Sequence, residues 1–251
     1  MLGAARFLRL TARTGQSAHA GKRTEPSMTT TTTSSPRPPH LEVRALTCCF
    51  GREAAVRDVH LDVASGEHVA IVGGNGSGKT TLLRAIMGLH RGWTGSIRLN
   101  GTELPASPEK AHPGMAWMPQ HLPKGQFPFT VGELLRAGTE KTAVLDAAGE
   151  LGIGGLLQRP LSALSGGQRQ RAYLARALGM LHEGASLLLA DEPTAALDFG
   201  GQEQVAEMLA VLPATMIIVT HDPNMARKCH RVLHMAQGRV REATDEWIPA
   251  S

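Results

Sequence analysis

One segment of the chain, residues 73–80, restricts the fold more than any other. It reads Gly73-Gly74-Asn75-Gly76-Ser77-Gly78-Lys79-Thr80, which fits the pattern G-x-x-x-x-G-K-[ST]. An apolar, strand-like run (67–72) precedes it and a helix-like segment (80–88) follows it. A strand, a glycine-rich turn and a helix in that order form a loop whose backbone N–H groups point at phosphate oxygens. The loop therefore predicts an α/β sheet in which strands alternate with helices.

The rest of the hydrophobic pattern agrees with that architecture. Alternating patterns at 41–47 and 56–63 predict half-buried antiparallel strands, and continuous apolar runs at 186–190 and 215–220 predict central parallel strands. Further strands are expected at 67–72, 96–100 and 115–118, and helices at 80–88, 131–160, 167–181 and 201–212. Within 131–160 the clearest helical segment is 142–151, and glycines 152–155 break it.

Composition excludes some classes of protein. No run approaches the roughly 18 apolar residues of a membrane-spanning helix. The net charge of +4 comes from the first 27 residues, and the remainder has 21 basic and 21 acidic side chains, so no nucleic-acid partner is expected. Residues 1–40 are expected to be disordered, with a Thr run and a Pro-rich end, and to be either a transit peptide or an over-extended start before Met28.

The phosphate loop assigns roles to three side chains. Lys79 is expected to place its charge between the β- and γ-phosphates of a nucleotide, and Thr80 to present a hydroxyl to Mg²⁺. Thr81 is placed to reach the α-phosphate. By itself the loop predicts only a nucleoside triphosphate, so kinases, GTPases, helicases and transport ATPases all remain open.

A second feature is an apolar strand, 187–190, that ends in Asp191 and Glu192. In an open parallel sheet, ligands bind beyond the carboxyl ends of the strands. Asp191 is then expected to hold a water of the Mg²⁺ shell. Glu192 lies nearer the γ-phosphate and can orient or deprotonate the attacking water.

The third feature is a short signature before a long helix. It reads Leu164-Ser165-Gly166-Gly167-Gln168, and its serine hydroxyl and glycine amides gather at a positive helix end. With this signature between the phosphate loop and the acidic strand end, the chain resembles the nucleotide-binding subunits of ABC transporters over residues 41–240. The resemblance implies a P-loop NTPase core with a mostly parallel sheet, an antiparallel β subdomain and a small α-helical signature subdomain. The implied domain is 41–251, with the helical subdomain at about 121–180.

The resemblance also assigns residues that the pattern alone does not. Phe50 matches the aromatic position that stacks on adenine. Gln120 matches the glutamine that contacts Mg²⁺ and communicates with the membrane subunit. Asp198 matches the aspartate that communicates across a dimer, and His221 the histidine on the γ-phosphate. The signature is implied to act in trans, so that two copies close on two ATP molecules. The implied catalytic set is Lys79, Gln120, Glu192 and His221.

The branch of the family is suggested by residues 127–131, Phe-Pro-Phe-Thr-Val, which are similar to those of zinc/manganese-type metal importers. The implied partners are integral-membrane permease subunits and an extracytoplasmic binding protein, with this chain at the cytoplasmic face of the membrane. Iron-chelate importers and exporters with separate subunits stay open as alternatives. A soluble ABC-type protein acting on ribosomes or DNA, and an inactive interaction protein, are less favoured. The chain has one cassette, no long coiled coil, and all of the expected catalytic residues.

Overall fold

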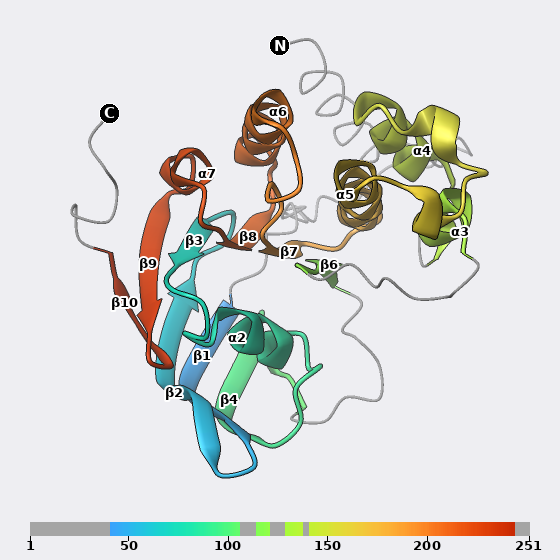
Figure 1. Ribbon diagram of the computed structural model, residues 1–251. Coiled ribbons are helices and arrows are strands. Elements are labelled where there is room, and N and C mark those ends of the chain that lie inside the picture. Colours follow the sequence, from blue (N-terminus) through green and yellow to red (C-terminus); the bar gives the residue numbers. More distant parts are fainter. Residues whose placement is uncertain (1–40, 106–113, 121–128, 138–140, 244–251) are drawn as a thin grey trace, which may run out of the picture.

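The computed structural model describes residues 41–105, 114–120, 129–137 and 141–243 (Figure 1). Its strands are β1 (Leu41–Phe50), β2 (Glu53–Val63), β3 (His68–Val72), β4 (Trp93–Leu99), β5 (Thr102–Glu103), β6 (Met115–Met118), β7 (Leu187–Asp191), β8 (Thr215–Val219), β9 (Arg231–Ala236) and β10 (Arg239–Glu242). Its α-helices are α2 (Lys79–Ile86), α3 (Val131–Arg136), α4 (Lys141–Glu150), α5 (Gly166–His182), α6 (Phe199–Ala210) and α7 (Pro223–Arg227). The predicted tail, 1–40, lies outside the described residues, as do 121–128 of the predicted helical subdomain.

The strands form two sheets. One is antiparallel, with the order β2-β1-β4-β5. The other has the order β10-β9-β3-β8-β7-β6, in which five strands run parallel and β10 returns antiparallel to β9. The predicted fold class, an α/β core with a mostly parallel sheet and an antiparallel β subdomain, is confirmed.

The central strands are buried on both faces, as their continuous apolar runs predict. Successive side chains of a strand point to opposite faces. Leu187, Leu189 and Ile217 accordingly pack into one core with α2 and the antiparallel sheet. Leu188 and Ile218 pack into the other core, with α5 and α6. Figure 1 shows α5, α6 and α7 on one side of this sheet, and β1, β2, β4 and α2 on the other.

The segment predicted to be helical at 131–160 differs in the structure. It contains two α-helices, α3 and α4, followed by a 3₁₀ turn at Gly154–Leu156. Helix α3 starts at a capping box in which the Thr130 hydroxyl accepts from Glu133 N and the Glu133 carboxylate accepts from Thr130 N. The segment predicted most clearly, 142–151, corresponds to α4, and the predicted break at glycines 152–155 follows its end. The prediction did not resolve α3 as a separate helix with its own start at Thr130.

The last part of the sheet was not predicted at all. Strands β9 and β10 and the short helix α7 lie beyond 220, where charged and histidine side chains interrupt the apolar pattern. Strand β9 nevertheless pairs with β3, with Ile71 opposite Leu233.

Within the described ranges, no helix is long and apolar enough to cross a membrane.

Candidate nucleotide site

The phosphate loop joins β3 to α2 and is held closely by two other strands. Gly73 and Gly78 both have positive φ, 149° and 107°. A Cβ at Gly73 would collide with Met235 O of β9, and a Cβ at Gly78 with Ala55 O of β2. These two positions therefore need glycine for both backbone conformation and space. The positive φ at Gly78 turns the chain directly into the first residue of α2.

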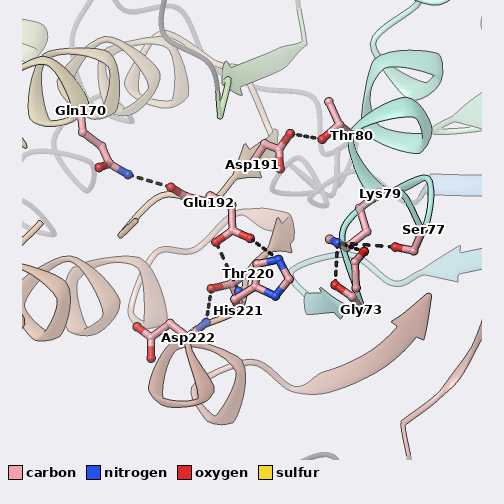
Figure 2. A network of polar contacts seen from close by, with 11 residues as sticks. Gly73, Ser77, Lys79, Thr80, Gln170, Asp191, Glu192, Thr220, His221 and Asp222 are labelled. Atoms are coloured by element: carbon pink, nitrogen blue, oxygen red, sulfur yellow. Dashed lines mark hydrogen bonds and ion pairs between the residues drawn. The ribbon is translucent and has the colours of Figure 1, made fainter. Parts of the chain in front are cut away.

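Lys79 lies at the base of this loop and is almost fully buried. Its Nζ donates to Gly73 O at 2.7 Å and to Gly74 O at 2.9 Å, as Figure 2 shows for Gly73. Burial lowers the pKa of the ammonium, and the nearby carboxylates of Glu192 and Asp191 oppose that shift. The ammonium is thus held at the loop among backbone oxygens, where an anionic ligand would favour its charged form.

The acidic strand end meets the loop as the parallel sheet predicts. Asp191 is the last residue of β7, and its Oδ2 accepts a hydrogen bond from Thr80 Oγ1 at 2.7 Å (Figure 2). Gln120 lies just after β6, the strand that pairs with β7, and is exposed. A hydroxyl, a carboxylate and an amide oxygen are the hard oxygen ligands that suit Mg²⁺. The residues present therefore fit this cation.

Glu192 follows Asp191 and is buried, with 6% of its surface exposed. Its Oε2 accepts from His221 N at 3.3 Å, and its Oε1 lies 3.3 Å from His221 Nε2. Burial, with a smaller effect from Asp191, raises the pKa of this carboxyl to about 7, whereas the hydrogen bond from His221 lowers it. Burial also lowers the pKa of His221. A carboxyl that titrates near neutral pH suits a general base.

These side chains line one open pocket of about 340 Å³. It is lined by Phe50, Glu53, Ala55, Asn75, Gly76, Ser77, Gly78, Lys79, Thr80, Thr81, Gln120, Asp191, Glu192 and His221. The fold thus brings together most of the predicted site, although Gly73 and Gly74 lie outside the pocket lining. Glu53 and Ala55 were missed by the sequence analysis, because nothing local to β2 marks it as a pocket wall.

Phe50 stands at the rim of the pocket, 58% exposed. Its ring meets that of His90 edge to face, with centroids 4.8 Å apart and an interplanar angle of 67°. Edge-to-face packing is a preferred geometry for aromatic rings. His90 therefore supports the ring from one side, a contact that the sequence spacing of 40 residues did not suggest.

The signature residues 164–168 lie outside the pocket lining. Ser165 caps α5: its Oγ accepts from Gln168 N at 3.2 Å, and Gln168 Oε1 accepts from Ser165 N at 3.1 Å. This is a capping box, for which Ser-x-x-Gln is the sequence signal. Asp198, predicted to act across a dimer, caps α6 by accepting from Gly201 N at 3.0 Å.

Known proteins match the chain over more than half of its length. The family model described as "ABC transporter" matches residues 56–195. The hemin import ATP-binding protein HmuV of Rhodopseudomonas palustris (strain HaA2) is 41% identical over 217 residues, which cover 80% of this chain and 82% of that protein. The probable export ATP-binding/permease protein MacB of Pseudomonas entomophila (strain L48) is 34% identical over 203 residues, which cover 74% of this chain but 30% of that protein.

Solved structures agree on the fold. The dimeric structure of MJ0796, a bacterial ABC transporter cassette, has a TM-score of 0.73 at 25% identity and covers 84% of this chain and 100% of its own. A bacterial Atm1-family ABC exporter with ATP bound also has a TM-score of 0.73, at 24% identity, over 82% of this chain and 39% of its own. With the phosphate loop and acidic strand end assembled in one pocket, these matches show that the chain belongs to the ABC transporter family of ATP-hydrolysing cassettes.

Proposed function

We propose that this chain is the ATP-hydrolysing subunit of a membrane importer for an iron chelate, with hemin as the cargo. One observation carries the choice of cargo: the 41% identity to a hemin import ATP-binding protein over 82% of that protein's length. The zinc/manganese cargo suggested by residues 127–131 finds no support in the relatives described above. An exporter is less favoured, because the MacB relative is less similar and matches over only 30% of its length.

The phosphate loop is proposed to hold the triphosphate of ATP. Its backbone N–H groups and the N-terminus of α2 bind the phosphate oxygens, and Lys79 lies between the β- and γ-phosphates. Phe50 stacks on the adenine at the rim of the pocket. Thr80, Gln120 and Asp191 would hold Mg²⁺, which when bound neutralises charge on the β- and γ-phosphates.

Glu192 is proposed to be the general base. Its carboxylate orients a water against the γ-phosphorus and takes up one of its protons as the new P–O bond forms. The bond from the γ-phosphorus to the β–γ bridging oxygen breaks, and ADP leaves with its electron pair. His221, 3.3 Å from the same carboxylate, contacts the γ-phosphate and keeps the carboxylate in place.

The signature is proposed to complete the pocket of a second copy of the chain. Ser165 and Gly166 are exposed and lie outside their own pocket. The capping box uses the Ser165 oxygen only as an acceptor, so its O–H can still donate to a γ-phosphate oxygen held by the partner. The helical subdomain, about 121–180, then receives the permease at the cytoplasmic face of the membrane, and an extracytoplasmic binding protein delivers the cargo.

Deletion of the gene in its native host tests the cargo. We expect uptake of hemin, and growth with hemin as the sole iron source, to be lost and then restored by the wild-type gene. Lys79→Ala, expressed at the same level, should not restore them. Growth in zinc- or manganese-poor medium and sensitivity to macrolides serve as the two comparison arms. Unchanged hemin uptake, or a defect confined to either comparison arm, would contradict the proposed cargo.

A further inference from the structure

The backbone of Glu192 has an unusual conformation. Its φ is +55°, in the left-handed region that side-chain-bearing residues rarely adopt. Such a conformation costs free energy and persists only where the surrounding contacts fix it. It turns the chain sharply after β7, so that Asp191 points to Thr80 while Glu192 points to His221 (Figure 2). Whatever fixes this backbone therefore fixes the direction of the carboxylate.

Three hydrogen bonds hold the peptide groups of Glu192. Its N–H donates to Val219 O at 2.8 Å, which ties it to the neighbouring strand β8. Its carbonyl oxygen accepts from Gln170 Nε2 at 2.7 Å and from Ala195 N at 3.3 Å. The shorter bond to the carbonyl thus comes from a side chain 22 residues away on α5 (Figure 2).

Gln170 is buried, with 5% of its surface exposed, and both ends of its amide are used. Its Oε1 accepts from Ala196 N at 2.7 Å, in the loop that follows Glu192. Because Ala196 N can only donate and Glu192 O can only accept, this bridge needs one donor and one acceptor on the same side chain. Leucine would supply neither, and ionised glutamate would lack the donor.

The bridge also connects Glu192 to the signature. Gln170 is on the same helix as the Ser165 cap, about 7.5 Å along the axis at 1.5 Å per residue. The loop at Ala196 packs on the signature glycines, since a Cβ at Gly167 would lie 3.1 Å from Ala196 O and one at Gly166 would lie 3.5 Å from Ala196 Cβ. The signature helix, this loop and the Glu192 backbone therefore form one connected unit.

We propose that Gln170 is a positioning residue for ATP hydrolysis, which holds Glu192 in its left-handed conformation and transmits movement of the signature helix to it. A nucleotide that a partner presents to Ser165 thereby acts on Glu192, the proposed general base in the chain's own pocket. This inference rests on the role proposed for Glu192 and is independent of the cargo.

The test compares variants of the full chain. Gln170→Leu removes both bonds with little change in volume, and Gln170→Glu keeps the acceptor for Ala196 N while losing the donor to Glu192 O. The matched control is Gln202→Leu: Gln202 Nε2 donates to Leu197 O at 3.1 Å in the same loop without touching Glu192. Steady-state hydrolysis gives kcat and KM, binding of a fluorescent ATP analogue gives affinity, and thermal unfolding reports folding.

We expect kcat to fall about 10- to 100-fold in both Gln170 variants, as for a misplaced catalytic group, with KM and analogue affinity within about twofold of wild type. Gln202→Leu should keep kcat within about twofold. An unchanged kcat in Gln170→Glu, or an equal fall in Gln202→Leu, would overturn the inference. Glu192→Gln is measured alongside: if it hydrolyses ATP normally, the base assignment itself is wrong, and the inference falls with it.

Discussion

Gly78→Ala should destabilise the fold because the phosphate loop packs closely against strands β2 and β9. Gly78 has φ +107°, and a Cβ there would collide with Ala55 O and lie 2.8 Å from Met235 Cε. The matched control is Gly76→Ala in the same loop: Gly76 also has positive φ, +77°, but an added Cβ meets nothing within 4 Å. Both variants carry a penalty for positive φ, and only Gly78→Ala adds a collision.

The expected magnitudes follow from these two terms. A left-handed alanine costs about 1–2 kcal/mol, and forcing an extra carbon into a packed site costs typically about 1–3 kcal/mol. Gly78→Ala should therefore lose about 2–5 kcal/mol of unfolding free energy, and Gly76→Ala only about 1–2 kcal/mol. At about 2–4 °C per kcal/mol for a domain of this size, the collision alone should lower the Tm by an extra ~2–12 °C.

Urea and thermal unfolding without nucleotide, followed by circular dichroism, measure this difference. ATP is left out because a ligand that binds the native state would mask part of the loss. If Gly76→Ala and Gly78→Ala lose the same free energy, the close approach of Ala55 O does not constrain the loop, and the steric reasoning is refuted.

Three further predictions concern the base, the signature and a buried histidine. Glu192→Gln should trap a dimer in ATP, because binding is kept and water activation is lost; a monomer in sedimentation with ATP would contradict the two-copy mechanism. Ser165→Arg should abolish hydrolysis while the same chain binds ATP almost normally, so a large loss of monomer affinity would show that the signature acts in cis. Burial lowers the pKa of His68, whose Nε2 forms a hydrogen bond with Leu212 O. Below about pH 6.5 this histidine is therefore protonated in the unfolded chain but still neutral in the folded chain. The free energy of unfolding should fall as the pH drops, by at most ~1.4 kcal/mol per pH unit. In urea unfolding from pH 7.5 to 5.5, His68→Gln should flatten this dependence; a slope equal to that of the wild-type chain would refute the assignment.

The local parts of the site could be predicted because each depends on residues adjacent in the chain. The spacing of the loop glycines and Lys79 fixes a turn between a strand and a helix. The run 187–190 gives a buried strand, and parallel strands place their carboxyl ends at one edge. The structure accordingly places Thr80 Oγ1 2.7 Å from Asp191 Oδ2, although the two residues are 111 positions apart in the sequence. The roles assigned to these residues in catalysis stay predictions.

The remaining parts depend on packing between distant segments. The pocket wall at Glu53 and Ala55 and the His90 ring against Phe50 have no local signal. Strand β10 is an edge strand, where charged side chains are tolerated, and the half-buried strand β9 beside it carries Arg231 and His234, so neither shows a continuous apolar run. The Ser165-x-x-Gln168 capping box is different, because its sequence signal is local and coincides with the signature residues.

The sequence by itself therefore determined the phosphate loop, the acidic strand end and the α/β class, since backbone conformation over a few residues follows from local residue types. Only the tertiary structure decided how Glu192 points. Besides a local bond from Ala195 N, its left-handed backbone is held by Val219 on one strand and Gln170 on a helix. A strained conformation is specified by contacts that meet only when the chain is folded, which is why local patterns do not reveal it.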